Sequence, residues 1–178
     1  MALERPNFEV IQKAGDVEIR NYAPYQVASC DVSDIEDLRQ ASSYGFQYLF
    51  NYISGQNAKS QKISMTVPVQ QKPSAGGWRI SFVVPSDVTN SGAPLPQSSR
   101  VELEDVPGGL VAALSYRGLW NTSKLEELQG ELITKIGALG YQPVGEAFSA
   151  VYNTPFTPPI LRHNEVLVRV KKAASRAK

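Results

Sequence analysis

The chain has 178 residues, of which 42% are hydrophobic, and its formal net charge is +1. That length can bury one sizeable core, so we expect a single domain over residues 1–172 and a disordered basic tail over residues 173–178. The balanced charge, without a basic patch outside the tail, argues against nucleic acid as a partner. The single cysteine excludes an intramolecular disulfide, and no apolar run reaches about 18 residues, so we expect a soluble, cytoplasmic protein that does not associate with membranes.

The first half of the chain predicts three short strands, a helix and two further strands. Alternating patterns predict the first strands at residues 8–13, 17–22 and 25–32. Ser33 and Glu36 have the spacing of a capping box, so a helix should follow directly and end near Gly55. Further strands are expected at residues 63–69 and 77–84, and then a mobile loop rich in Pro, Ser and Gly at residues 86–99. The predicted helix has an apolar stripe made of Ile35, Leu38, Ser42, Phe46, Leu49 and Ile53.

The second half repeats this order about 90 residues later. Strands at residues 101–106 and 110–118 precede a second capping box, Ser123 with Glu126, and a helix that ends at Gly140. Asn121-Thr122-Ser123 matches a glycosylation sequon but serves better as the cap of that helix. Strands at residues 147–153 and 164–170 close the chain. The second apolar stripe consists of Leu125, Leu128, Leu132, Ile136 and Leu139.

Two such units predict an α+β fold. Duplicated β-α-β-β units, each with one apolar helix stripe, require a curved antiparallel sheet on which both helices pack. The concave part of such a sheet that the helices leave uncovered is a natural ligand pocket.

The only histidine, His163, excludes metal sites that need two histidines. Glycine-rich nucleotide-binding patterns are also absent from the sequence, which argues against nicotinamide and nucleotide enzymes. Strand alternation places His163 on the same face as Glu165, opposite the valines of the last strand. On these features His163 is more commonly a bystander than a base or ligand, and Cys30 is more commonly a small core residue than a nucleophile.

Aromatic residues occupy every second position of the first predicted helix, so they cannot all share one face. Phe46 and Phe50 are expected in the core. Tyr44, Tyr48 and Tyr52 form a neighbouring stripe that suits the rim of a pocket for a flat hydrophobic ligand, although simple contact with a neighbouring strand or loop explains it as well.

Five segments resemble, in order and spacing, the haem-binding protein/SOUL family: DVEIRNYAPYQVA, FQYLFNYISGQN, KISMTVPV, ISFVVP and YNTPFTPPILRHNEV. The resemblance runs from about Phe8 to Val170. It implies a distorted antiparallel β-barrel flanked by two helices, a fold shared with the effector-binding domains of multidrug-responsive transcription regulators. It also implies binding of haem or another tetrapyrrole in a hydrophobic cleft, without catalysis.

The functional positions of the family carry over incompletely. Where some members place a haem-ligating histidine this chain has Asn21, and where others place cationic side chains it has Ser43 and Asn51. His163 stands where the family usually has arginine. We therefore expect the ligand to be bound by Asn21, Ser43, Tyr44, Tyr48, Asn51, Tyr52 and Met65, with His163 as the alternative axial ligand.

The sequence thus predicts a small, non-catalytic binding protein for haem or a related tetrapyrrole, which folds without haem and is a monomer or weak dimer. Apolar burial at about 25 cal/mol per Å² gives useful affinity without an axial bond. One alternative is a sensor or carrier of other hydrophobic small molecules. Another is a hydrolase of such molecules, in which Glu165 or His163 acts as the base and tyrosines donate hydrogen bonds.

Overall fold

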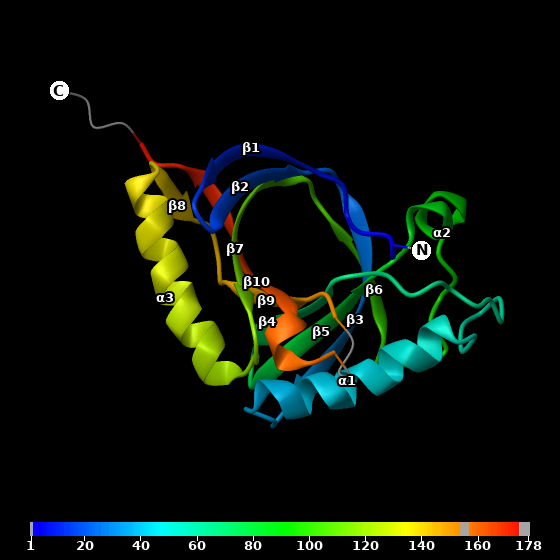
Figure 1. Ribbon diagram of the computed structural model, residues 1–178. Helices are drawn as coiled ribbons and strands as arrows, with labels where there is room; N and C mark the ends of the chain where they lie inside the picture. The colour runs from blue at the N-terminus through cyan, green and yellow to red at the C-terminus, as the bar shows by residue number, and fades with distance from the viewer. Residues whose placement is uncertain (1, 154–156, 175–178) are drawn as a thin grey trace.

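Figure 1 shows the computed structural model, in which residues 2–153 and 157–174 are described. One curled antiparallel sheet encircles the centre of the molecule, and helices α1 (Leu38–Ile53) and α3 (Thr122–Ala138) lie on its outer side (Figure 1). A short helix, α2 (Ser86–Ser91), and a 3-10 turn, η1 (Pro159–Leu161), lie in the connections. No helix among the described residues is long and apolar enough to cross a membrane.

Among the described residues, ten strands form the sheet. Nine of them follow the order β1-β2-β7-β10-β9-β4-β5-β3-β6, and β8 pairs separately with β10. Their bounds are β1 (Phe8–Ala14), β2 (Val17–Tyr22), β3 (Tyr25–Ser33), β4 (Val69–Ser74), β5 (Gly77–Val83), β6 (Glu102–Val106), β7 (Gly109–Arg117), β8 (Tyr141–Pro143), β9 (Phe148–Val151) and β10 (His163–Lys172).

The strand order confirms the predicted duplication. The series β7-β10-β9 from the second half is mirrored by β4-β5-β3 from the first, and the two series meet where β9 pairs with β4. Strand β2 precedes the first unit in the chain but pairs with β7 of the second unit. Strand β6 precedes the second unit but pairs with β3 of the first unit. This exchange joins the two units in a single sheet, as expected for the predicted α+β fold.

The two faces of the sheet have different roles. Ile19, Ala112 and Val166 point outward and belong to the core beneath the helices. Leu125, Leu128, Leu132 and Ile136 of α3 are buried there, as predicted. The opposite, concave face holds a smaller apolar cluster together with polar side chains. Because successive strand residues alternate between faces, this division follows directly from the sequence pattern.

The details of α1 differ from the prediction. Its N-cap is Asp37, whose side chain accepts a hydrogen bond from the backbone of Gln40, so the predicted capping box at Ser33 is wrong. Phe46 and Phe50, predicted in the core, are 38% and 50% exposed. The helix instead turns its small residues toward the sheet: a Cβ atom added to Gly45 would lie 2.7 Å from a side-chain carbon of Ile80.

Three other local predictions also need correction. Residues 63–69 do not form a strand before Val69, and β4 follows them. The expected mobile loop contains α2, whose Val88 belongs to the core. Asn121 accepts the capping hydrogen bond of α3, so the predicted capping box of Ser123 with Glu126 is wrong, whereas the predicted capping role of residues 121–123 is confirmed. Of the predicted tail, residues 175–178 lie outside the described residues.

The close approach of α1 to β5 makes a testable prediction. Gly45→Ala is expected to lower the free energy of unfolding by about 1 kcal/mol, because overpacking against Ile80 exceeds the gain in helix propensity. Gly130→Ala in α3 is the matched control, since nothing lies within 4 Å of its added Cβ. The free energy of unfolding of this control variant, measured by urea denaturation, should rise by up to about 1 kcal/mol. An equal gain for both variants would contradict the close contact.

Candidate functional site

A cleft of about 620 Å³ lies between the first half of α1 and strands β4 and β9, on the outer side of the sheet. Phe46, Val69, Trp120 and Val151 supply its apolar walls. Arg39, which is exposed, and Arg162, which is half-buried, supply positive charge. The Arg162 guanidinium is anchored, because its Nε donates to the Thr157 carbonyl oxygen at 2.7 Å. The other lining residues are polar: Asp37, Gln40, Ser42, Ser43, Gln71 and Asn153.

Two polar atoms in this lining are buried without a partner. Ser42 Oγ and Gln71 Oε1 make no hydrogen bond to any described residue. Gln71 is only 1% exposed. Because buried polar groups in proteins are nearly always hydrogen-bonded, these two atoms stand out among the residues of the lining.

The predicted site residues are distributed over several places. Ser43 lines the cleft, and with Tyr44 it also borders a shallower hollow on α1. Tyr48, Asn51 and Tyr52 line a separate pocket of about 100 Å³. Tyr52 is a core residue, 1% exposed, whose hydroxyl donates to the Pro94 carbonyl oxygen.

Asn21 is exposed on β2, and the half-buried Met65 packs against the outer core. Neither borders the cleft. Gln71, Trp120 and Arg162 line the cleft and were not predicted from the sequence. A correct assignment of β4 would have placed Gln71 on the same face as Val69 and so could have found it.

None of the described residues that line the cleft is His, Cys or Met, the usual protein ligands of haem iron. His163 lies on the concave face of the sheet, beside Glu165. Cys30 is fully buried in the outer core, and burial raises the pKa of its thiol, as expected for a core residue.

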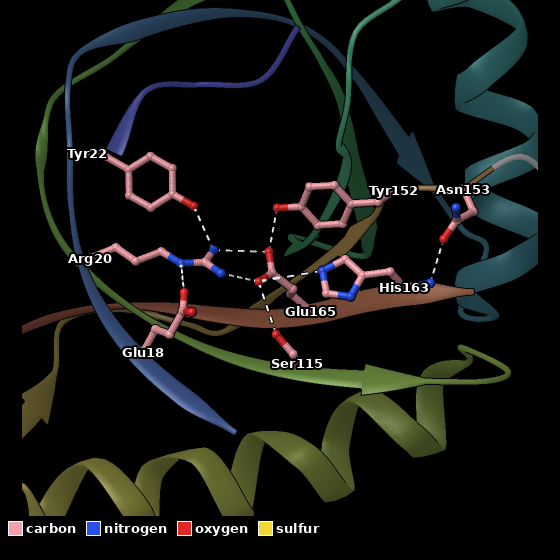
Figure 2. A network of polar contacts seen from close by, with 8 residues as sticks. All are labelled: Glu18, Arg20, Tyr22, Ser115, Tyr152, Asn153, His163 and Glu165. Carbon is pink, nitrogen blue, oxygen red and sulfur yellow. Dashed lines mark hydrogen bonds and ion pairs between the residues drawn. The ribbon is translucent and has the colours of Figure 1, made fainter. Parts of the chain in front are cut away.

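A buried polar network occupies the concave face (Figure 2). Arg20 on β2 donates to both carboxylate oxygens of Glu165 on β10, with Nη1 at 3.0 Å from Oε1. The hydroxyls of Tyr152 and Ser115 donate to the same carboxylate. Burial alone would raise the pKa of Glu165, but the hydrogen bonds and charge of Arg20 outweigh it and hold that pKa below its ordinary value. Glu165 is therefore a charged structural residue.

His163 borders this network without completing it. Its Nε2 is 3.9 Å from Glu165 Oε2, and its ring centroid is 5.0 Å from that of Tyr152. Its backbone N–H donates to the Asn153 side chain (Figure 2). With its carboxylate already accepting from three side chains, Glu165 is unsuited to the general-base role considered for a hydrolase.

Comparison with known proteins identifies the family. Residues 3–169 match the family described as SOUL heme-binding protein. The chain belongs to the SOUL haem-binding family. Heme-binding protein 2 of Homo sapiens is 32% identical to this SOUL protein over 182 aligned positions, which cover 93% of the chain and 85% of that relative. The predicted family membership is thus confirmed.

Two solved structures share the fold of this SOUL protein at low identity. A hydrolase from Listeria innocua has a TM-score of 0.56 and 11% identity, covering 90% of this chain and 94% of its own. EcmrR, in a complex with DNA, has a TM-score of 0.65 and 10% identity, covering 88% of this chain and 57% of its own. At such identities the likeness establishes the fold alone.

The buried ion pair predicts a large effect on stability. Arg20→Met is expected to lower the free energy of unfolding by about 3–5 kcal/mol, because it leaves Glu165 buried and uncompensated. The double variant Arg20→Met/Glu165→Leu should recover a large part of that loss, because it removes the buried Glu165 charge and leaves only Glu18, whose side chain is 23% exposed, without its ion pair to Arg20. Chemical denaturation of both variants measures the difference. A loss below about 1 kcal/mol in the single variant would show that the pair does not stabilise the fold.

Acid sensitivity provides a second test of the pair. The lowered pKa of Glu165 means that its ionised form stabilises the folded chain above the unfolded pKa of about 4.3, and that this contribution is lost as the pH falls through the lower folded pKa. Glu165→Gln should therefore lose less stability than the native protein between about pH 5 and pH 3. Urea midpoints measured across this range make the comparison, and parallel profiles would contradict the assignment.

Proposed function

We propose that this SOUL protein binds haem or a related tetrapyrrole in the cleft beside α1, without a catalytic step. The supporting observation is the combination of apolar walls with two arginines in one cleft. Its volume of about 620 Å³ lies within the range of about 300–1,000 Å³ typical of small-molecule sites. Phe46, Val69 and Val151 suit a flat apolar ring, and family membership supports haem as the ligand class.

The polar groups of the cleft suit the propionates of such a ring. Arg39 and Arg162 can pair with carboxylates, for which the guanidinium geometry is favourable. The Ser42 hydroxyl can donate to a propionate. The Gln71 amide can do so as well, because its oxygen and nitrogen can exchange places by a flip of the amide group.

The cleft supports a mode of binding that does not depend on iron. Its lining offers apolar contact and carboxylate recognition, and no imidazole, thiolate or thioether from the described residues. The porphyrin ring and its propionates are then the recognised features. The iron of haem would bring its own redox and ligand chemistry, and this cleft would shield one face of the ring from water.

Titration with two matched ligands tests this proposal. Haemin and protoporphyrin without iron are expected to bind with affinities within about threefold of each other, because both present the same ring and carboxylates. Ser43→Trp, which fills the cleft, should weaken the binding of both ligands by tenfold or more. Gln47→Trp is the control, because Gln47 is exposed on the same helix and does not line the cleft, and this variant should leave the binding of both ligands unchanged. Tight binding of haemin with none of the metal-free porphyrin would contradict the proposal.

His163 is expected to be a bystander in haem binding. His163→Ala should leave the Soret maximum unchanged and the haem affinity within about threefold, because the imidazole faces the other side of the sheet from the cleft. Absorbance spectroscopy makes the measurement, with circular dichroism to verify the fold. A shifted Soret band in the folded variant would identify His163 as an axial ligand.

A further inference from the structure

A second cavity, of about 270 Å³, lies on the concave face of the sheet. Strand β4 separates it from the cleft beside α1: Gln70 lines this cavity, whereas its neighbour Gln71 lines the cleft. Because adjacent strand residues point to opposite faces, the two spaces share a wall but not an interior. The second cavity is therefore independent of the proposed tetrapyrrole site.

Aromatic side chains form much of this cavity. Tyr22, Tyr25 and Phe148 line it, above an apolar floor that includes Val111 and Leu167. Tyr22 and Tyr25 lie with their ring centroids 6.2 Å apart. Such walls suit a small aromatic ring.

Positive charge gathers at the same place. Lys72 on β4 lies directly opposite Arg79 on β5, and both line the cavity with Arg169 of β10. Like charges in directly opposed positions destabilise a sheet unless an anion compensates them. Arg79 is compensated, since it forms ion pairs of 2.8 Å with Asp31 and with Glu104.

The other two cations remain available to a ligand. Lys72 forms no ion pair with any described residue. Arg169 donates to the Pro107 carbonyl oxygen, and its ion-pairing capacity is otherwise unused among the described residues. Tyr25 accepts a hydrogen bond from Gln70 Nε2 at 3.1 Å, which leaves its own hydroxyl proton free to donate.

The carboxylates of the concave face are already engaged. Glu104 is paired with Arg79, and Glu165, further along the same face, is paired with Arg20. A cationic ligand would therefore have to break an existing ion pair. An anionic ligand would meet two cations and a hydroxyl donor without breaking one.

From these contacts we propose that the concave cavity is a second binding site, selective for a small aromatic carboxylate. The ring lies against Tyr22, Tyr25 and Phe148, and the carboxylate is held by Lys72, Arg169 and the Tyr25 hydroxyl. The volume limits the ligand to one or two fused rings, well below the size of a tetrapyrrole.

Calorimetric titration with 2-naphthoate and 2-naphthamide tests the proposal, because the two probes differ in charge and hardly in shape. The carboxylate is expected to bind at least tenfold more tightly than the amide. Lys72→Gln and Arg169→Gln should each weaken the binding of 2-naphthoate by fivefold or more and leave the binding of 2-naphthamide unchanged. Lys72 is exposed, so its variant is expected to fold normally.

Two further measurements separate this site from the tetrapyrrole cleft. The Lys72→Gln variant should bind haemin as the native protein does, and Ser43→Trp should leave 2-naphthoate binding unchanged. Equal affinity for the two naphthalene probes, or no binding of 2-naphthoate at millimolar concentration, would overturn the second site. Loss of 2-naphthoate binding in Ser43→Trp would likewise overturn it, by placing the probe in the cleft.

Discussion

The buried ion pair between Arg20 and Glu165 holds together the part of the sheet where the two halves of the chain exchange strands. Arg20 lies on β2, Glu165 on β10, and β7 runs between them, with Ser115 of β7 donating to the same carboxylate. The network thus connects three neighbouring strands across their concave side (Figure 2). Burying either charged side chain without the other would cost free energy, because the buried charge would have lost its water and gained no partner. The pair therefore favours this arrangement of β2, β7 and β10 over arrangements that leave one of the two charges buried and unpaired.

With the charges of Arg20 and Glu165 paired on the concave side, the sheet can use its two faces differently. The outer face carries the helices, and the offset of α1 from β4 and β9 leaves the cleft that we assign to a tetrapyrrole. The concave face keeps a smaller, cationic cavity. The two sites lie back to back on β4, where Gln70 and Gln71 face opposite ways. This arrangement gives one small domain two cavities of different chemical character.

The sequence predicted the elements whose pattern is regular. The apolar stripe of α3 follows from periodic burial. The first three strands and β10 form where their sequence patterns predicted them, although β1 is almost entirely exposed and β10 is buried on both faces. Prediction from the sequence failed where tertiary packing decided which side chains are buried. Phe46 and Phe50 read as core residues, but Gly45 lets α1 approach β5 on its small-residue side and so leaves both phenylalanines outside.

The candidate site was harder to predict, because its residues come from segments far apart in the chain. Trp120 and Arg162 stand in connections that have no periodic pattern, and only the fold brings them beside Ser43. The partnership of Glu165 depends on Arg20, 145 residues away, which no local pattern reveals.

The position of bound haem tests the account most directly. Ferric haem is paramagnetic, so backbone amide signals near it broaden in nuclear magnetic resonance spectra of the labelled protein. Broadening centred on Ser43, Gln71 and Val151, with the signals of Arg20 and Tyr22 preserved, is the predicted result. Broadening centred on Arg20, Tyr22 and the concave face would contradict the assignment of the cleft beside α1 as the tetrapyrrole site.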